Sequence, residues 1–260
     1  MTQGVIYVAT GADYLELART SAQSLRATNP GLAIDLFTDQ LGVVDPGEFD
    51  RVHPVPRVHA RAKLECLPLS RFSRTLYLDC DTLVVGDLGN VFSLLDRFDL
   101  AMAHDVRRAS DLIQEGLHVA TPYAFPQMNS GVLLYRKSPE TDGFFAQWAR
   151  KFHASGVSRD QIVLKDMLWE TKLRFYVLPP EFNLRRVTVL DAWEPADCEV
   201  KIIHSHRFMD HMRVPGAARI KDIESLLKAE REALKAEWLE IDTPNRLRWF
   251  SARRTERALK

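Results

Sequence analysis

Two aspartates interrupt an apolar run in the sequence RTLYLDCDTLVVGD, at Asp79 and Asp81. The run before them is typical of a buried strand, where an ionised carboxylate must be solvated, paired or bound to a cation. Alternate residues of a strand point to the same side, so the two carboxylates can reach one point, and one divalent cation there would neutralise both. The other interpretation is structural: Asp81 caps a turn and Asp79 pairs with an arginine such as Arg74.

A histidine that follows another apolar run could complete such a metal site. The run KII precedes His204, and His206 follows two residues later and could substitute if the strand register differs. Two carboxylates with one imidazole suit Mn²⁺ better than Mg²⁺, which prefers oxygen ligands in octahedral geometry. The alternative for His204 is a hydrogen-bonded structural residue at the end of a strand.

The elements that must position these residues alternate between strands and helices. A strand is predicted over 5–10, followed by a helix that Asp13 would cap and that Asn29-Pro30 would stop. One face of this helix is expected to carry Leu15, Leu17, Ala18, Ser21, Ala22 and Leu25. Further strands are expected over 33–38, 50–58, 75–78, 100–104, 131–135 and 200–203, and helices over 63–69, 141–154, 159–169 and from 220.

A strand, a helix and another strand form a βαβ unit, so the first half is predicted to be doubly wound around a parallel sheet. In such sheets ligands bind outside the carboxyl ends of the strands, where 10–14, 79–81 and His204 all fall. Residues 105–128 are predicted to be an irregular loop and a candidate lid over these strand ends.

Composition excludes several classes of protein. The 260 residues contain 35 Lys and Arg and 35 Asp and Glu, so no overall field favours nucleic acid, and no nucleic-acid partner is expected. The three cysteines form no CxxC pair, which disfavours zinc ribbons and disulfide frameworks and fits a reducing cytoplasm. No signal peptide or membrane-spanning run is apparent, so a cytoplasmic enzyme is expected.

Six features in order resemble those of one enzyme family. They are VIYVATGADYL near the start, Lys63-Leu64, RTLYLDCDTLV, FPQMNSGVLLY with Asn129-Ser130-Gly131, Asp160-Gln161, and KIIHSH. Together they resemble the retaining glycosyltransferases that include glycogenin and the bacterial lipopolysaccharide galactosyltransferases, family 8 of the GT-A-fold enzymes. The resemblance implies an α/β GT-A fold whose mixed, mainly parallel sheet is flanked by helices.

The resemblance also implies a reaction and its cofactor. A sugar would move from a nucleoside diphosphate sugar, expected to be a UDP-sugar, to a hydroxyl of a carbohydrate or glycolipid acceptor, with the anomeric configuration retained. Asp79, Asp81 and His204 would hold Mn²⁺ or Mg²⁺ against the donor phosphates. Asp160 and Gln161 would act as the catalytic pair beside the sugar, with Gln161 near the anomeric centre.

Further donor contacts are implied along the chain. They are Ala9 and Thr10 under the nucleobase, Tyr14 on its face, Lys63 near the phosphates, and Asn129 and Ser130 at the sugar. The family usually continues after its metal histidine with a glycine and a lysine that touch the phosphates, whereas Arg207 and Asp210 stand there in this chain. Arg207 or Arg213 would then supply the positive charge.

Two other functions stay open on the sequence. LYLDCDTLV also resembles the opening motif of haloacid-dehalogenase-like phosphatases, in which Asp79 would be the nucleophile. A nucleotide-sugar-binding protein without activity is the second alternative.

The chain is predicted to divide into a catalytic domain, 1–218, and a helical, basic and aromatic tail, 219–260. Within this tail, 245–260 would either contact an anionic membrane surface peripherally, on its inner face, or lie in solvent.

Overall fold

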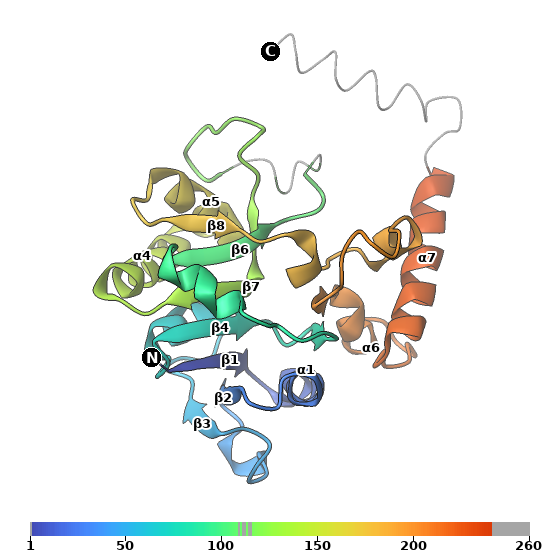
Figure 1. Ribbon diagram of the computed structural model, residues 1–260, viewed down its shortest axis with the longest axis horizontal. Coiled ribbons are helices and arrows are strands. Elements are labelled where there is room, and N and C mark those ends of the chain that lie inside the picture. Colours follow the sequence, from blue (N-terminus) through green and yellow to red (C-terminus); the bar gives the residue numbers. More distant parts are fainter. Residues whose placement is uncertain (1, 109, 111–112, 114–115, 241–260) are drawn as a thin grey trace.

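Seven strands form the central sheet, in the order β3-β2-β1-β4-β7-β6-β8. Figure 1 shows them stacked in this order in a computed structural model, which describes residues 2–108, 110, 113 and 116–240. A second sheet pairs β5 with β9. The strands are β1 (Gln3–Ala9), β2 (Ala33–Thr38), β3 (Arg51–Pro54), β4 (Arg74–Leu78), β5 (Thr82–Val84), β6 (Leu100–His104), β7 (Met128–Arg136), β8 (Phe175–Val177) and β9 (Ile202–His204).

Helices connect the strands and cover the sheet. The α-helices are α1 (Ala12–Thr28), α2 (Lys63–Cys66), α4 (Pro139–Ser155), α5 (Asp160–Glu170), α6 (Asp210–Arg213) and α7 (Ile223–Glu240). Short 3₁₀ helices are η1 (Leu41–Val43), η2 (Leu67–Leu69), η3 (Val91–Asp96), η4 (Pro180–Phe182), η5 (Val187–Asp191) and η6 (His206–Met209).

The main sheet is mixed and mainly parallel, as predicted. β1, β2, β3 and β4 run parallel to one another, and β6 and β8 are a parallel pair. Among the described strands of this main sheet, β7 alone runs opposite, antiparallel to both β4 and β6. The start of β7 therefore meets the carboxyl ends of β4 and β6 at one edge of the sheet.

Two hydrophobic cores lie on the two faces of the sheet. In β1, Val5 and Tyr7 belong to one core and Ile6 to the other, because successive strand residues point to opposite faces. Leu25 of α1 packs into the first core, whereas Trp148 of α4 packs into the second. The fold thus has three layers, with the sheet between helices.

The structure of helix α1 confirms most of the predictions made from its sequence. All six residues expected on its inner face are buried, and the helix ends at Asn29 as predicted. Its N-cap, however, is Gly11, with φ of 81°, so the prediction of Asp13 as the cap was wrong. Asp13 lies within the first turn instead, where a carboxylate favours the helix dipole.

Other boundaries differ from the prediction. The strand expected over 50–58 is limited to β3, between Arg51 and Pro54, and β7 begins at Met128 rather than at 131. β8 was missed, because its three residues carry no buried apolar pattern. The run before His204 forms β9 outside the main sheet. The candidate lid, 105–128, is described only in part, and 245–260 lies outside the described residues.

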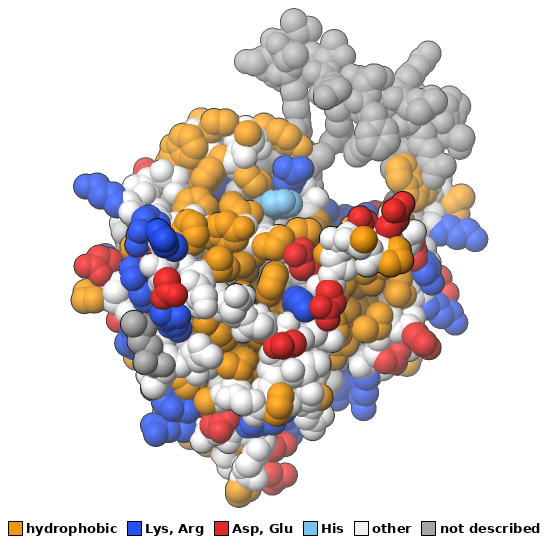
Figure 2. Space-filling model, viewed as in Figure 1, with side chains coloured by type: hydrophobic (Ala, Val, Ile, Leu, Met, Phe, Trp, Pro, Cys, Tyr) orange, Lys and Arg blue, Asp and Glu red, His pale blue; other side chains and the backbone are white. Residues whose placement is uncertain are grey.

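Charges of both signs are interspersed on the face of the molecule drawn in Figure 2, in keeping with the equal numbers of acidic and basic residues. Among the described residues, no helix combines the length and the apolar character that a membrane span requires.

A matched pair of leucine substitutions tests this layer assignment. Leu25 of α1 has no exposed surface, whereas Leu239 of α7 is 77% exposed. We expect Leu25→Ala to lower the free energy of unfolding by about 2–5 kcal/mol, because it leaves a cavity in the core. Leu239→Ala should change it by less than about 0.5 kcal/mol. Urea denaturation followed by circular dichroism measures both, and equal losses would contradict the assignment.

Candidate active site

Asp79 and Asp81 lie where β4 ends at the edge of the sheet. The amide of Asp79 donates to the carbonyl of Gly131 at 2.7 Å, which extends the β4–β7 ladder by one residue. The hydroxyl of Thr82 then donates to the carbonyl of Asp79 at 2.8 Å and closes the turn into β5. In β5, Thr82 pairs with His204 of β9. This antiparallel pairing brings the imidazole beside both carboxylates.

The three side chains offer one compact set of donor atoms. Nε2 of His204 is 3.3 Å from Oδ1 of Asp81 and 3.8 Å from Oδ2 of Asp79, and one atom from each residue lies within 4.8 Å of the others. Neighbouring ligands of an octahedral ion with bonds of about 2.1 Å are about 3 Å apart, so the set fits a divalent cation after small adjustments. His206 lines the adjoining cavity but is not in this cluster.

Hydrogen bonds fix the orientation of His204. Its Nδ1 is 2.9 Å from the amide oxygen of Asn183, an acceptor, so Nδ1 carries a proton. Nε2 faces the aspartates, where it donates to Asp81 when it is protonated and offers its lone pair to a cation when it is not. Asn183 donates in turn to Oδ1 of Asn129 at 3.1 Å, and Asn129 donates to Asp105 at 3.4 Å. A hydrogen bond to the outer ring nitrogen is what a metal-binding histidine needs.

Asp79 is held from its other side by Lys63 and Tyr77. Nζ of Lys63 is 3.3 Å from Oδ1 of Asp79, and the Tyr77 hydroxyl donates to the same oxygen. Arg74, at the opposite end of β4, donates to Asp96. Asp79 therefore forms an ion pair with Lys63. The structural interpretation of the sequence had given it Arg74 as its partner.

Asp160 belongs to the same charged network behind the cavity. Its carboxylate accepts from the Ser130 hydroxyl at 2.9 Å and lies 3.6 Å from Nζ of Lys63 and 3.1 Å from Nε of Arg61. Burial alone would raise the pKa of Asp160, but the two cations outweigh it and hold that pKa below its usual value. Asp160 is therefore an anion at neutral pH, although it is only 2% exposed.

The charge states of Lys63 and Asp81 follow from similar balances. Burial disfavours the charged form of Lys63, yet the Asp160 and Asp79 carboxylates raise its pKa above the usual value. Burial likewise opposes ionisation of Asp81, and the nearby His204 and Arg185 lower its pKa nonetheless. The site thus keeps buried groups of both signs ionised.

A cavity of about 500 Å³ opens in front of these residues. Of the residues singled out in the sequence, those that line it are Thr10, Tyr14, Lys63, Asp79, Asp81, Asn129, Gln161, His204, His206 and Arg213. Its walls also contain three arginines that the sequence patterns did not single out, namely Arg61, Arg159 and Arg185. Arg61 and Arg185 lie outside the predicted helices and strands, and Arg159 stands at the first position of the helix predicted over 159–169, so helical or strand periodicity did not mark any of them as a site residue.

Four of the predicted site residues do not line this cavity. Ala9 is fully buried at the end of β1, and Ser130 and Asp160 lie behind the wall, bonded to each other. Arg207 lies 3.3 Å from Asp210 and 3.6 Å from Glu230, so its guanidinium is engaged with carboxylates away from the cavity.

Asn129 and Ser130 were expected where a loop passes into a strand. They lie inside β7 instead, and both are buried. Gln161 follows Asp160 in the first turn of α5, and its amide nitrogen donates to the carbonyl of Met128 at 3.0 Å.

Comparison with known proteins identifies the fold. No protein-family model matches the chain, and no curated protein matches it in sequence. Among solved structures, an active-site mutant of LgtC is similar at 15% identity, with a TM-score of 0.57 over 82% of this chain and 92% of that one. Mouse xyloside xylosyltransferase 1 is 16% identical, with a TM-score of 0.53 over 79% of this chain and 98% of that one.

The chain has the GT-A fold. GlyE of Streptococcus pneumoniae TIGR4, also a glycosyltransferase, is similar as well, at 20% identity and a TM-score of 0.53 over 78% of this chain. The chain spans 54% of the length of GlyE. The fold predicted from the six sequence features is thereby confirmed, and the resemblance to family 8 is consistent with these neighbours.

A pair of glycine substitutions tests the geometry of the cluster. A Cβ on Gly131 would lie 2.1 Å from Cε1 of His204 and 2.6 Å from Oδ2 of Asp79, whereas a Cβ on Gly143 of α4 would meet nothing within 4 Å. We expect Gly131→Ala to weaken Mn²⁺ binding by ~10-fold or more, because it displaces two ligands. Gly143→Ala should leave it unchanged. Isothermal titration with Mn²⁺ measures both, and equal affinities would count against this metal site.

Proposed function

We propose that the protein transfers a sugar from a nucleoside diphosphate sugar to a hydroxyl acceptor, as a glycosyltransferase. The observation that carries the proposal is the meeting of Asp79, Asp81 and His204 on the wall of a cavity that is also lined by arginines. The GT-A fold supports it, since the similar structures are of glycosyltransferases, one of them LgtC in complex with donor and acceptor sugar analogues.

Asp79, Asp81 and His204 are proposed to hold the divalent cation, with Mn²⁺ favoured by the mixed oxygen and nitrogen ligands. The ion would act as a Lewis acid on the departing diphosphate and relieve the need for a protonated acid. The ion pair between Lys63 and Asp79 would keep the positive charge of Lys63 beside that of the bound cation.

Arg185 and Arg213 are proposed as the diphosphate contacts in place of the glycine and lysine usual in the family. Both line the cavity, and Arg185 donates to the carbonyl of His204 at 3.3 Å, directly beside the metal cluster. A guanidinium matches phosphate oxygens with two parallel hydrogen bonds. Arg207, the residue named first from the sequence, is held by Asp210 and Glu230.

The donor sugar is proposed to lie against Gln161 and Asn129, which both line the cavity. Asp160 and Ser130 act behind them, because their mutual hydrogen bond and the contacts to Lys63 hold the wall in place. Retention of configuration would follow from front-face substitution, in which the leaving phosphate oxygen helps deprotonate the acceptor hydroxyl.

The nucleobase, expected to be uracil, is proposed to stack on Tyr14 near Thr10. Tyr14 is 38% exposed on the cavity wall at the start of α1, and stacking of a base on such a ring contributes about 1–3 kcal/mol. Ala9 would support the base from beneath without direct contact.

All of these proposed donor contacts fall within 1–218, which we assign as the catalytic domain. The tail from 219 remains a proposed appendage, although Leu226 of α7 packs into the first core. Peripheral contact of 245–260 with a membrane bearing a glycolipid acceptor also remains a proposal.

The phosphatase alternative is not favoured by the fold or its neighbours. Incubation of the protein with Mn²⁺ and a panel of nucleotide sugars separates the three functions. Release of nucleoside diphosphate supports the transferase. Hydrolysis of a phosphate monoester with covalent trapping at Asp79 would support the phosphatase, and binding without release would indicate an inactive protein.

An Asp-to-Asn pair tests the role of the metal cluster. We expect Asp81→Asn to reduce transfer at least ~10²-fold with the fold intact, because it removes a charge that the transition state needs. Asp191→Asn is the matched control, since Asp191 is exposed and pairs with Arg231 away from the cavity. Wild-type turnover of Asp81→Asn, measured as nucleoside diphosphate release, would refute the proposed role.

Two arginine substitutions separate the candidate phosphate contacts. We expect Arg185→Met to raise the KM for the donor ~10-fold or more, because it removes a charge-assisted contact. Arg207→Met should change that KM by less than ~3-fold, because its charge is already paired with Asp210 and Glu230. Steady-state kinetics with varied donor measures both, and the reverse order would restore Arg207 to the site.

A further inference from the structure

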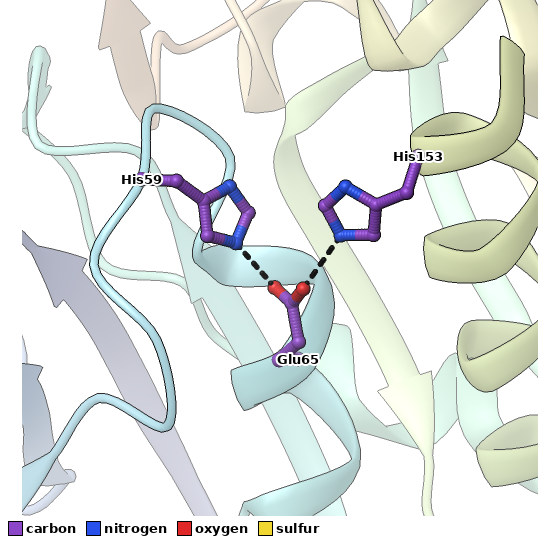
Figure 3. A group of neighbouring side chains, drawn as sticks. All are labelled: His59, Glu65 and His153. Carbon is purple, nitrogen blue, oxygen red and sulfur yellow. Dashed lines mark hydrogen bonds and ion pairs between the residues drawn. The ribbon is translucent and has the colours of Figure 1, made fainter.

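A second group of metal-ligating side chains lies beside the loop before α2. Figure 3 shows His59, Glu65 of α2 and His153 of α4 converging, with the carboxylate between the two imidazoles. Nε2 of His59 is 2.9 Å from Oε2 of Glu65, and Nε2 of His153 is 2.7 Å from Oε1. These donor atoms lie within 4.8 Å of one another, as in the cluster of Asp79.

A cation already occupies part of this position. The guanidinium of Arg57 lies 2.9 Å from Oε1 of Glu65 and 2.7 Å from Nε2 of His153, so it contacts two of the three donor atoms. The Arg57 side chain is 60% exposed and can therefore move into solvent at low cost. The negative charge of Glu65 thus attracts a cation to this position, and the Arg57 guanidinium that lies there can be displaced by another cation.

The contacts of Nε2 of His153 with Glu65 and with Arg57 cannot both be hydrogen bonds, because this nitrogen carries either one proton or one lone pair. If Nε2 carries a proton, it donates to Glu65 but faces the N–H of Arg57 at 2.7 Å. If Nε2 is unprotonated, it accepts from Arg57 but its lone pair faces a carboxylate oxygen. A metal ion that replaces the Arg57 guanidinium between Nε2 and the carboxylate removes both conflicts, because each atom then donates a lone pair to the same ion.

The ligand types select the metal. Two imidazoles and one carboxylate, with room for water, form the set that binds Zn²⁺ in open sites, whereas Mg²⁺ and Ca²⁺ prefer oxygen alone. His59 accepts from the amide of Arg61 through Nδ1 at 3.3 Å, so the proton now on Nε2 must move to Nδ1 when the metal binds. This change of tautomer loses only the long hydrogen bond from the Arg61 amide to Nδ1 of His59.

We propose that His59, Glu65 and His153 form a Zn²⁺ site distinct from the one at Asp79. The ion joins the segment before α2 to α4, two elements far apart in the sequence. The stretch of chain from His59 to Glu65 also carries Arg61 and Lys63, which contact Asp160, and His59 itself lines the cavity. Zinc at this position therefore clamps the strip of chain that supplies cations to the candidate active site.

Zinc titration of the full chain, stripped of metal beforehand, tests the proposal with Zn²⁺ alone as the probe. Competition with a chromophoric chelator gives affinity and stoichiometry for the wild type and for Asp81→Asn, which disables the first cluster. We expect Asp81→Asn to retain one zinc site, and we expect that zinc raises its melting temperature. His153→Ala should lose this site, with affinity reduced at least ~10-fold.

Two further variants keep the test decisive. Glu65→Gln removes the carboxylate charge with little change in shape and should also weaken the site ~10-fold or more, which covers the case in which His153→Ala fails to fold. Arg57→Ala should bind zinc more tightly than the wild type, because the competing guanidinium is gone. The proposal is overturned if Asp81→Asn binds no zinc, or if both ligand variants bind it like the wild type. Equal zinc affinity of Arg57→Ala and the wild type would show that Arg57 does not compete with the metal.

Discussion

Burial of ionised groups at the end of β4 is the constraint on which the rest of the structure depends. Lys63, Asp81 and Asp160 are each at least 92% buried, and a charge in that position is tolerated only when an opposite charge lies close by. The ammonium group of Lys63 compensates the negative charge of Asp160, and His204 together with Arg185 compensates that of Asp81. A shift of any of these elements would leave a charge uncompensated, so their relative positions are fixed together.

The fold provides these compensating charges from segments that are distant in the sequence. β7, inserted antiparallel beside β4, places Ser130 between Lys63 and Asp160 and leaves Gly131 opposite Asp79, where any side chain would collide. The small sheet of β5 and β9 then delivers His204. The position of β7 is therefore as important to the site as the two aspartates themselves.

The sequence predicted what local chemistry encodes. Asp79 and Asp81 after an apolar run, a histidine after another, and the periodic face of α1 were all visible, because strand alternation and helical spacing depend on near neighbours. Arg185 and Asn183 were not, since each acts through a partner supplied by tertiary packing. Arg207 shows the converse: its spacing from His204 suggested a phosphate contact, but neighbouring acids hold it elsewhere.

The pairing of Thr82 with His204 also bears on how the chain folds. The aspartates belong to the first third of the sequence, yet their imidazole partner arrives only with β9, which follows all seven strands of the main sheet in the sequence. Contacts between such distant segments form late, because closing a long loop costs entropy before the contact repays it. A nascent chain that still lacks β9 has the carboxylates without their imidazole partner, so the complete cluster of Asp79, Asp81 and His204 forms only once β9 has left the ribosome.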